Sequence, residues 1–123
     1  MIRILIAEDD HDLRCTLRVA LEIEGYEVEA VADGEKAIHA QQARPADLLI
    51  ADLFMPNRDG LETVKYFRAH NPRMPIVAIS GWSSRQQADH LGVAEIAGAN
   101  AVFRKPFRVG ALLQQLKSLT SPK

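Results

Sequence analysis

Apolar and polar residues alternate along the chain in blocks that are typical of strands and helices in turn. Five short, mainly apolar runs have the length of strands, and the first and third are apolar enough for burial on both faces. The second run alternates apolar and acidic residues, so we expect one of its faces to be wetter. The predicted strands are residues 2–7, 26–32, 48–51, 75–79 and 101–104.

Helical spacing of apolar residues follows the first, second, third and fifth runs, and a fourth helix is predicted within residues 84–97. The turn residues that bound these helices are Gly25 after the first, Asp33-Gly34 and Arg44-Pro45 around the second, and Asp59-Gly60 before the third. The residues predicted to face the core are Leu13, Leu17, Ala20 and Leu21, then Ala37, Ile38 and Gln41, then Leu61, Val64 and Phe67, and finally Val109, Leu112, Leu113 and Leu116.

Five strand–helix alternations in 123 residues predict one α/β domain, a doubly wound parallel sheet with helices on both faces. The hydrophobic fraction of 47% suffices for a core, and the charged fraction of 25% suffices for a solvated surface. No apolar stretch is long enough to cross a bilayer, and the N-terminus lacks the pattern of a signal peptide. The single cysteine, Cys15, excludes an internal disulfide framework, so we expect a cytoplasmic protein without a membrane partner.

The net charge of −1 conceals two halves of opposite charge. Residues 1–62 contain 6 Lys/Arg and 14 Asp/Glu, a balance of −8, whereas residues 63–123 contain 9 Lys/Arg and 2 Asp/Glu, a balance of +7. The basic half lacks the dense Lys/Arg stripe of a nucleic-acid-binding protein. We therefore expect a solvated basic face and no direct contact with nucleic acid.

Polar residues end four of the predicted strands, and parallel strands bring their carboxyl ends to one edge of the sheet. Glu8-Asp9 follows the first strand, Asp52 the third, Ser80 the fourth and Lys105 the fifth. Ligands of doubly wound sheets bind at this edge. Three carboxylates and one lysine leave about two negative charges, which a Mg²⁺ ion would neutralise. A carboxylate beside Mg²⁺ and lysine is equipped to attack phosphorus.

These residues, in this order and spacing, resemble the receiver domains of two-component response regulators over nearly the whole chain. The matching motifs are Ile4-Leu5-Ile6-Ala7-Glu8-Asp9 with Arg14, then Leu48-Leu49-Ile50-Ala51-Asp52 with Met55-Pro56 and Asp59-Gly60, then Pro75-Ile76-Val77-Ala78-Ile79-Ser80-Gly81, and Gly98-Ala99 through Arg104-Lys105-Pro106-Phe107. The resemblance implies a flavodoxin-like sheet in the order 2-1-3-4-5. It also implies a receiver domain at residues 1–120, a short tail at 121–123 and no output domain in this chain.

The resemblance implies a role for each site residue. Asp52 would accept a phosphoryl group from a histidine kinase or a histidine phosphotransfer protein, and the protein would then signal to a downstream target. Glu8 and Asp9 would bind Mg²⁺ with Asp52 and the backbone carbonyl of Phe54. The hydroxyl of Ser80 and the ammonium of Lys105 would bind the phosphoryl group. Such a domain is not an enzyme beyond its own phosphotransfer and slow dephosphorylation.

Two further expectations concern neighbours of these residues. The five-residue step to Arg14 selects Glu8 and Asp9 as the acidic pair, which leaves Asp10 as the N-cap region of the first helix. In this family the peptide bond after the lysine is usually cis, so we expect a cis bond between Lys105 and Pro106.

The chain departs from the family pattern in three places. Val102 stands where the family often has an aromatic switch residue, and strand alternation turns Phe103 to the other face. Ser80 and Lys105 are 25 positions apart, about three more than is common, which indicates a longer loop around Trp82. Phe54 and Trp82 are bulky where small or polar residues are frequent.

Three other functions fit parts of the pattern. Asp10-His11-Asp12-Leu13-Arg14 approaches the nucleophile motif of haloacid-dehalogenase phosphatases, but Arg14 replaces its Thr or Val. A flavodoxin-type FMN site needs a phosphate-binding loop where the acidic residues 8–10 stand. A receiver fold kept as a docking module that is never phosphorylated is the remaining alternative, and the complete acidic, hydroxyl and lysine set argues against it.

Overall fold

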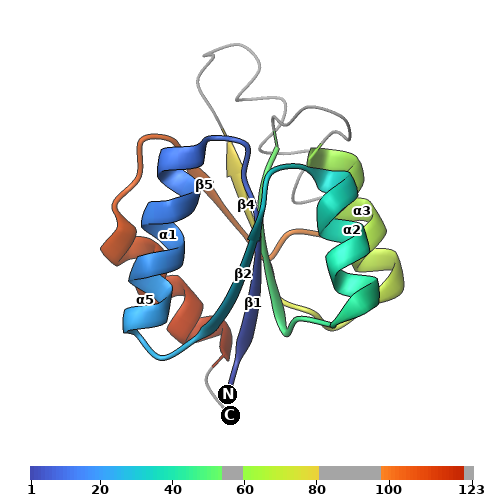
Figure 1. Ribbon diagram of the computed structural model, residues 1–123, viewed down its shortest axis with the longest axis horizontal. Coiled ribbons are helices and arrows are strands. Elements are labelled where there is room, and N and C mark those ends of the chain that lie inside the picture. Colours follow the sequence, from blue (N-terminus) through green and yellow to red (C-terminus); the bar gives the residue numbers. More distant parts are fainter. Residues whose placement is uncertain (54–59, 81–97, 121–123) are drawn as a thin grey trace.

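The computed structural model describes residues 1–53, 60–80 and 98–120. The five strands of the described residues are β1 (Arg3–Ala7), β2 (Glu27–Val31), β3 (Leu48–Asp52), β4 (Ile76–Ser80) and β5 (Ala101–Arg104). Their four helices are α1 (His11–Ile23), α2 (Gly34–Ala43), α3 (Gly60–His70) and α5 (Val109–Thr120). All strand pairs are parallel, and the order in the sheet is β2-β1-β3-β4-β5 (Figure 1). The predicted α/β sheet and its 2-1-3-4-5 order are therefore confirmed.

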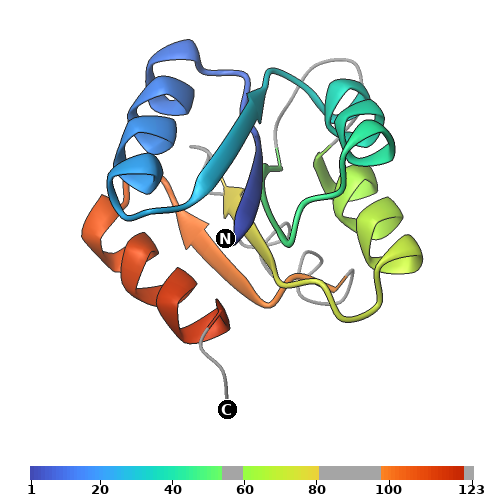
Figure 2. The ribbon, with the colours of Figure 1, turned by 60° about the horizontal axis from the view of Figure 1, so that its bottom comes forward.

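Two helix layers cover opposite faces of the sheet, α1 and α5 on one side and α2 and α3 on the other (Figures 1 and 2). Alternate residues of each strand contribute to the two cores, because successive strand side chains point to opposite faces. In β1, Ile4 and Ile6 pack toward α1 and α5, whereas Leu5 and Ala7 pack toward α2 and α3. Every residue of β3 and β4 is buried, as expected for central strands of a parallel sheet.

The predicted boundaries differ from the observed ones by one residue at the ends of several strands. β1 begins at Arg3, β2 loses one residue at each end, β3 extends to Asp52, and β4 is shifted by one residue to include Ser80. The alternation in β2 is confirmed. Val28 and Ala30 pack against the core on the α1 and α5 side, while Glu27 and Glu29 bind the guanidinium of Arg3.

Local sequence signals determine how the first two helices begin. The Asp10 carboxylate accepts hydrogen bonds from the backbone N–H groups of Asp12 and Leu13 at 3.0 and 3.2 Å, which confirms it as the N-cap of α1. Asp33 caps α2 in the same manner through the N–H of Lys36 at 2.8 Å. After α1 the chain turns through Gly25, whose φ of 96° favours glycine.

The inward faces of the helices follow the predicted spacing, with differences in α1 and α5. In α1, Leu17 and Leu21 are buried, whereas Leu13 is half-buried against the core and Ala20 lines a groove on the outer side of the helix. Leu112 and Leu116 are buried, whereas Val109 and Leu113 are only half-buried. In α3, Val64 and Phe67 are buried, and Leu61 packs against the same core from a half-buried position.

Helix α3 begins in direct contact with the end of β3. A Cβ atom on Gly60 would lie 2.0 Å from the carbonyl oxygen of Asp52 and 2.5 Å from the Cα of Leu53. Only glycine allows so close an approach of two backbones. Gly60, which was predicted to open this helix, therefore also sets the packing beside Asp52.

Several expectations concern residues outside the described ranges. They are the helix within 84–97, the loop around Trp82, the Phe54 carbonyl and the helix-opening Asp59. In the parts of the chain that the structure describes, every helix is too short or too polar to cross a bilayer.

Candidate functional site

The carboxyl edge of the sheet brings together the polar residues that end four strands. Asp52 and Ser80 are the last residues of β3 and β4, Glu8 directly follows β1, and Lys105 directly follows β5. Glu8, Asp52 and Ser80 are almost completely buried, with exposed fractions of 0%, 2% and 0%. Polar groups without solvent depend on one another or on a ligand for their interactions.

Lys105 connects the two buried carboxylates. Its Nζ lies 3.0 Å from Oδ2 of Asp52, and 3.0 and 3.2 Å from the two carboxylate oxygens of Glu8. The backbone N–H of Lys105 donates to the carbonyl of Ser80 at 2.8 Å, which holds the lysine beside the end of β4. The Lys105–Pro106 peptide bond is cis, the isomer expected from the family resemblance.

Negative charge is concentrated around this lysine. Carboxylate oxygens of Glu8, Asp9 and Asp52 all lie within 4.8 Å of one another, an arrangement that can hold a metal ion. Burial, together with a hydrogen bond to Asp52 and its charge, raises the pKa of Glu8 to about 8. Burial acts to lower the pKa of Lys105, but the two carboxylates outweigh it and raise that pKa. The edge thus carries more acid than its single lysine neutralises.

The three consecutive acids at the end of β1 differ in position. Glu8 points into the buried edge, Asp9 is exposed at its rim, and Asp10 caps α1. The N–H of Asp10 donates to Oε2 of Glu8 at 3.0 Å, and Arg14 Nη1 donates to the carbonyl of Glu8 at 2.8 Å. Arg14 therefore holds the backbone that presents the acidic pair.

Two buried polar atoms at this edge lack a hydrogen bond within the described part of the chain. They are Oγ of Ser80 and Oε1 of Glu8. The second atom forms an ion pair with Lys105, but their geometry is not that of a hydrogen bond. Buried groups of this kind are uncommon in folded proteins, and an absent ion or ligand is one established reason for them. Both atoms belong to residues at the carboxyl ends of strands, so this edge offers unsatisfied polar groups to an ion or a ligand.

The neighbouring residues follow the sequence predictions where the structure describes them. Val102 packs toward α2 and α3, whereas Phe103 packs toward α1 and α5 and meets the ring of Phe107 edge-on at 5.8 Å. His11, His39 and His70 are exposed, and His90 lies outside the described residues.

Two positions at the edge have roles that the sequence patterns did not indicate. Gly60 was recognised as a helix-opening residue, but its contact with the Asp52 carbonyl depends on the packing of α3. Phe107 lines a pocket of about 340 Å³ beside the edge, together with Asp10, Leu13, Lys105 and Pro106. The Lys-Pro-Phe motif was the signal available for this pocket, because Phe107 follows the site lysine by two positions.

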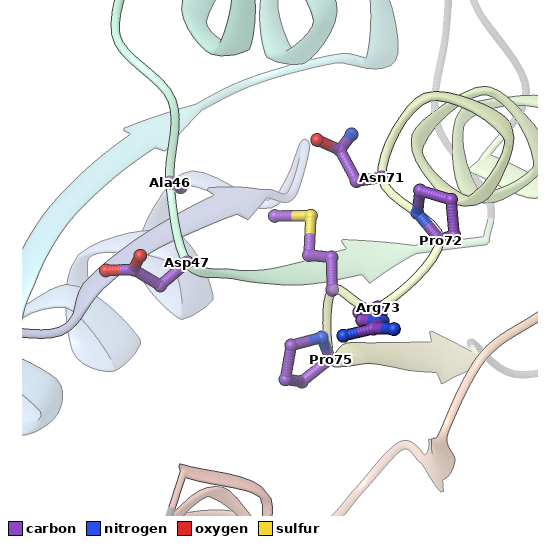
Figure 3. A pocket seen from close by; sticks show the side chains of 7 residues that line it. Ala46, Asp47, Asn71, Pro72, Arg73 and Pro75 are labelled. Carbon is purple, nitrogen blue, oxygen red and sulfur yellow. The ribbon is translucent and has the colours of Figure 1, made fainter.

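A second hollow lies at the opposite edge of the sheet, away from the acidic group. It has a volume of about 460 Å³ and is lined by the residues that precede β3 and β4 (Figure 3). Its lining residues are Ala46, Asp47, Asn71, Pro72, Arg73, Met74 and Pro75. No group of three or more possible metal ligands occurs there among the described residues, so the carboxyl edge is the candidate site.

Comparisons with known proteins agree with this geometry. The response regulator receiver domain family matches residues 4–117, and the chain belongs to this family. The response regulator MprA of Mycobacterium bovis is 32% identical over 118 residues, which cover 96% of this chain and 50% of that protein. The chain spans about half the length of the curated relatives it matches.

Solved structures show the same fold. A putative response regulator from Chloroflexus aurantiacus is 28% identical with a TM-score of 0.89, and the match covers 98% of both chains. The chemotaxis protein CheY4 of Vibrio cholerae is 30% identical with a TM-score of 0.84, covering 97% of this chain and 98% of that one. The protein is a receiver domain of the response regulator type, the phospho-accepting switch module of two-component signalling. Response regulators interact with histidine kinases and with downstream targets.

Proposed function

We propose that this receiver domain is phosphorylated on Asp52. The observation that carries the proposal is the position of this carboxylate, which is 2% exposed and lies 3.0 Å from the ammonium of Lys105. A carboxylate oxygen of Asp52 forms the new bond to phosphorus. The bond from phosphorus to the donor breaks, and the donor leaves as an imidazole nitrogen of a phosphohistidine or as acetate from acetyl phosphate.

The residues present fit a Mg²⁺ ion. Hard divalent cations prefer carboxylate and carbonyl oxygens, and the donors here are the carboxylates of Glu8, Asp9 and Asp52. The Oε1 atom of Glu8 has no hydrogen bond among the described residues, and a cation would satisfy it. The backbone carbonyl of Phe54 is the further ligand that family membership suggests. When bound, Mg²⁺ supplies positive charge that offsets the charge of the phosphoryl oxygens.

Lys105 and Ser80 respond to the new group. In the unphosphorylated protein Lys105 Nζ is shared between Asp52 and Glu8. Phosphorylation moves the negative charge outward from Asp52, so the ammonium pairs with a phosphoryl oxygen. The hydroxyl of Ser80 has no hydrogen-bond partner within the described residues and is available to donate to another such oxygen. These shifts bias the conformational equilibrium of the domain toward an active state.

The proposed partners follow from this chemistry. A histidine kinase or a histidine phosphotransfer protein donates the phosphoryl group, and a downstream protein recognises the phosphorylated form. The proposed location is the cytoplasm. Beyond its own phosphotransfer and slow hydrolysis, no further enzymatic activity is proposed.

Phosphoryl uptake tests the proposal and its alternative together. Incubation with acetyl phosphate and Mg²⁺ should add one phosphoryl mass to the wild type and none to Asp52→Asn. Asp47→Asn is the matched control, because Asp47 lies at the other end of the same strand and is exposed, and it should be modified like the wild type. An unmodified wild type would favour the docking module. A normal mass shift in Asp52→Asn would show that another residue accepts the group.

A further inference from the structure

Arg14 of α1 is a cation beside the acidic edge whose side chain binds the backbone instead of a carboxylate. Its Nη1 donates to the carbonyl of Glu8 at 2.8 Å and makes a longer contact with the carbonyl of Asp9 at 3.4 Å. No ion pair of Arg14 occurs within the described ranges of the chain. The guanidinium therefore holds the turn between β1 and α1 and does not neutralise one of its acids.

The two carbonyls that Arg14 contacts lie on either side of the Asp9 Cα atom. Because each peptide unit is planar, a bond to its carbonyl restrains the whole unit. The unit between Asp9 and Asp10 has a second restraint, since the N–H of Asp10 donates to Oε2 of Glu8 at 3.0 Å. Among the described residues, the unit between Glu8 and Asp9 is held by the Arg14 bond alone. Arg14 thus restrains the φ and ψ angles of Asp9, and these angles set the direction of its Cβ atom.

Glu8 and Asp9 are positioned in different ways. The Glu8 carboxylate is buried, and its oxygens are bound directly by Lys105 and by the N–H of Asp10. The Asp9 carboxylate is exposed and has no hydrogen bond or ion pair with another residue that the structure describes. One of its oxygens nevertheless lies within 4.8 Å of carboxylate oxygens of Glu8 and Asp52. The position of Asp9 in this acidic group therefore depends on the backbone that carries it.

We propose that Arg14 is a positioning residue for the metal site, and that it acts by directing the Asp9 carboxylate toward Glu8 and Asp52. The inference rests on the Mg²⁺ binding proposed above. Mg²⁺ requires nearly octahedral geometry, so it tolerates poorly a ligand whose backbone is not held in place. Groups that orient metal ligands without touching the metal typically contribute roughly 10–100-fold to metal affinity.

The charge of Arg14 and its position predict opposite effects on metal affinity. As a cation near the carboxylates, the guanidinium repels Mg²⁺, so its removal would strengthen metal binding if charge alone mattered. As the restraint on Asp9, it keeps a ligand in place, so its removal would weaken metal binding. Water and salt screen the charge of a half-buried side chain, whereas they do not replace the restraint on the backbone. We therefore expect the loss of position to dominate.

Titration with Mn²⁺ measures the affinity without any phosphoryl chemistry. Mn²⁺ binds to the same kinds of oxygen ligand as Mg²⁺, and the electron paramagnetic resonance signal of the free ion reports the bound fraction. Arg14→Met should raise the Kd at least about tenfold above that of the wild type. Arg18→Met is the matched control, because Arg18 is exposed one helical turn further along α1 and forms no ion pair with a described residue. Its Kd should equal that of the wild type.

A conservative variant tests whether the bond to the backbone is the cause. Arg14→Lys keeps the charge and one donor group that can reach the Glu8 carbonyl, but it cannot span both carbonyls as a guanidinium does. Its Mn²⁺ affinity should lie between those of the wild type and Arg14→Met. Thermal unfolding without metal shows whether each variant is folded, and Arg14→Gln replaces Arg14→Met if the latter does not fold. Equal affinities of Arg14→Lys and Arg14→Met would contradict the restraint through the Glu8 carbonyl.

Phosphorylation by acetyl phosphate separates metal binding from the chemical step. In Arg14→Met the Mg²⁺ concentration that gives half the maximal rate should rise at least about tenfold. The rate at saturating Mg²⁺ should stay close to that of the wild type, because the 3.0 Å contact of Lys105 with Asp52 does not involve Arg14. A lower maximal rate with an unchanged half-saturating concentration would contradict a role in positioning the metal ligands.

The Mn²⁺ titration also distinguishes this inference from the proposed function. A wild type that does not bind Mn²⁺ would refute the proposed metal site and, with it, the role of Arg14. If the wild type binds Mn²⁺ and Arg14→Met binds it equally well or more tightly, only the role of Arg14 is overturned.

Discussion

The two edges of the sheet use polar residues in opposite ways. At the amino edge, where the parallel strands begin, most polar groups of the described residues are paired, although Nε of Arg3 has no hydrogen-bond partner among them. The N–H of Arg3 donates to Asp47, and the N–H of Ile76 donates to the side chain of Asn100, both at 2.8 Å. At the carboxyl edge, Glu8 has a raised pKa and Ser80 lacks a hydrogen-bond partner among the described residues. Both edges are formed by the same five strands, so the fold itself does not impose the difference.

The amino edge also contains the most extensive polar connection of the described residues. Arg68 of α3 donates to the carbonyls of Gly98, Asn71 and Pro72 and to the side chain of Asn100. These bonds join α3 to the turn before β5. The contrast shows that the amino edge is arranged for stability and the carboxyl edge for binding, since unsatisfied groups are costly unless a ligand completes them.

Replacing Gly60 by alanine should have the largest effect on stability. The new Cβ would collide with the backbone of Asp52 and Leu53, which cannot move aside without disturbing β3. We expect a loss of about 3 kcal/mol in the free energy of unfolding, measured by urea denaturation. Phosphoryl uptake should fall as well. Gly110→Ala is the control, because nothing lies within 4 Å of its added Cβ and a helical alanine should stabilise by about 0.5–1 kcal/mol. Equal stability of the two variants would contradict the close contact.

Removing the guanidinium of Arg68 should weaken the amino edge without affecting phosphoryl chemistry. Arg68→Met keeps an apolar stem but loses the bonds to three carbonyls and to Asn100, so we expect a loss of about 2 kcal/mol. Arg73→Met changes an exposed neighbour on the same edge and should alter stability by about 0.5 kcal/mol or less. Acetyl phosphate labelling of the Arg68 variant at a temperature where it is folded should match the wild type. Defective labelling would mean that the two edges are coupled.

The protonation of Glu8 predicts how metal-free stability depends on pH. The ordinary pKa of 4.5 is raised to about 8 in the folded protein. Between these values the folded state binds more protons than the unfolded chain, so the free energy of unfolding should fall as pH rises from about 4.5 to about 8. Glu8→Gln lacks this group and should have a flatter profile.

Thermal denaturation of the same variant sharpens the contrast between the edges. At pH 8 without metal, Glu8→Gln should be more stable than the wild type by on the order of 1–2 kcal/mol. Added Mg²⁺ should stabilise the wild type and have a smaller effect on the variant, because one ligand is missing. Asp9→Asn should relieve less repulsion than Glu8→Gln, since Asp9 is exposed, and it should still abolish phosphorylation. If the free energy of unfolding depended on pH identically in the wild type and in Glu8→Gln, the raised pKa of Glu8 would be refuted.

The smallest effect is expected from Asp47 at the amino edge. Asp47→Ala removes the acceptor of the Arg3 N–H, which lies near solvent, so water replaces it at a cost of about 0.5–1 kcal/mol. Asp47→Asn retains an acceptor oxygen and should cost less. Urea denaturation of both variants, with phosphoryl uptake as the second readout, would show whether this edge contributes only to stability. A loss of uptake would contradict that separation.

Much of the fold could be predicted because the local patterns agreed with one another. Continuous apolar runs identified β1 and β3 as buried strands, the alternation in β2 matched a strand with polar residues on one face, and Asp10 and Asp33 marked helix starts. The site residues were recognisable because Glu8, Asp52, Ser80 and Lys105 each end such a run, and parallel strands place those ends together. Periodicity and strand direction are properties of short segments, so they can be read before the chain is folded.

The tertiary structure alone decided which acid is buried, how α3 approaches Asp52 and what Arg68 binds. Glu8 and Asp9 are adjacent and chemically alike in the sequence, yet only Glu8 lies within reach of Lys105, 97 positions away. The contact of Gly60 with β3 and the bonds of Arg68 to Gly98 likewise join distant segments. Burial and charge interaction depend on the distances between such segments, and therefore the raised pKa of Glu8 follows from packing, which no local pattern encodes.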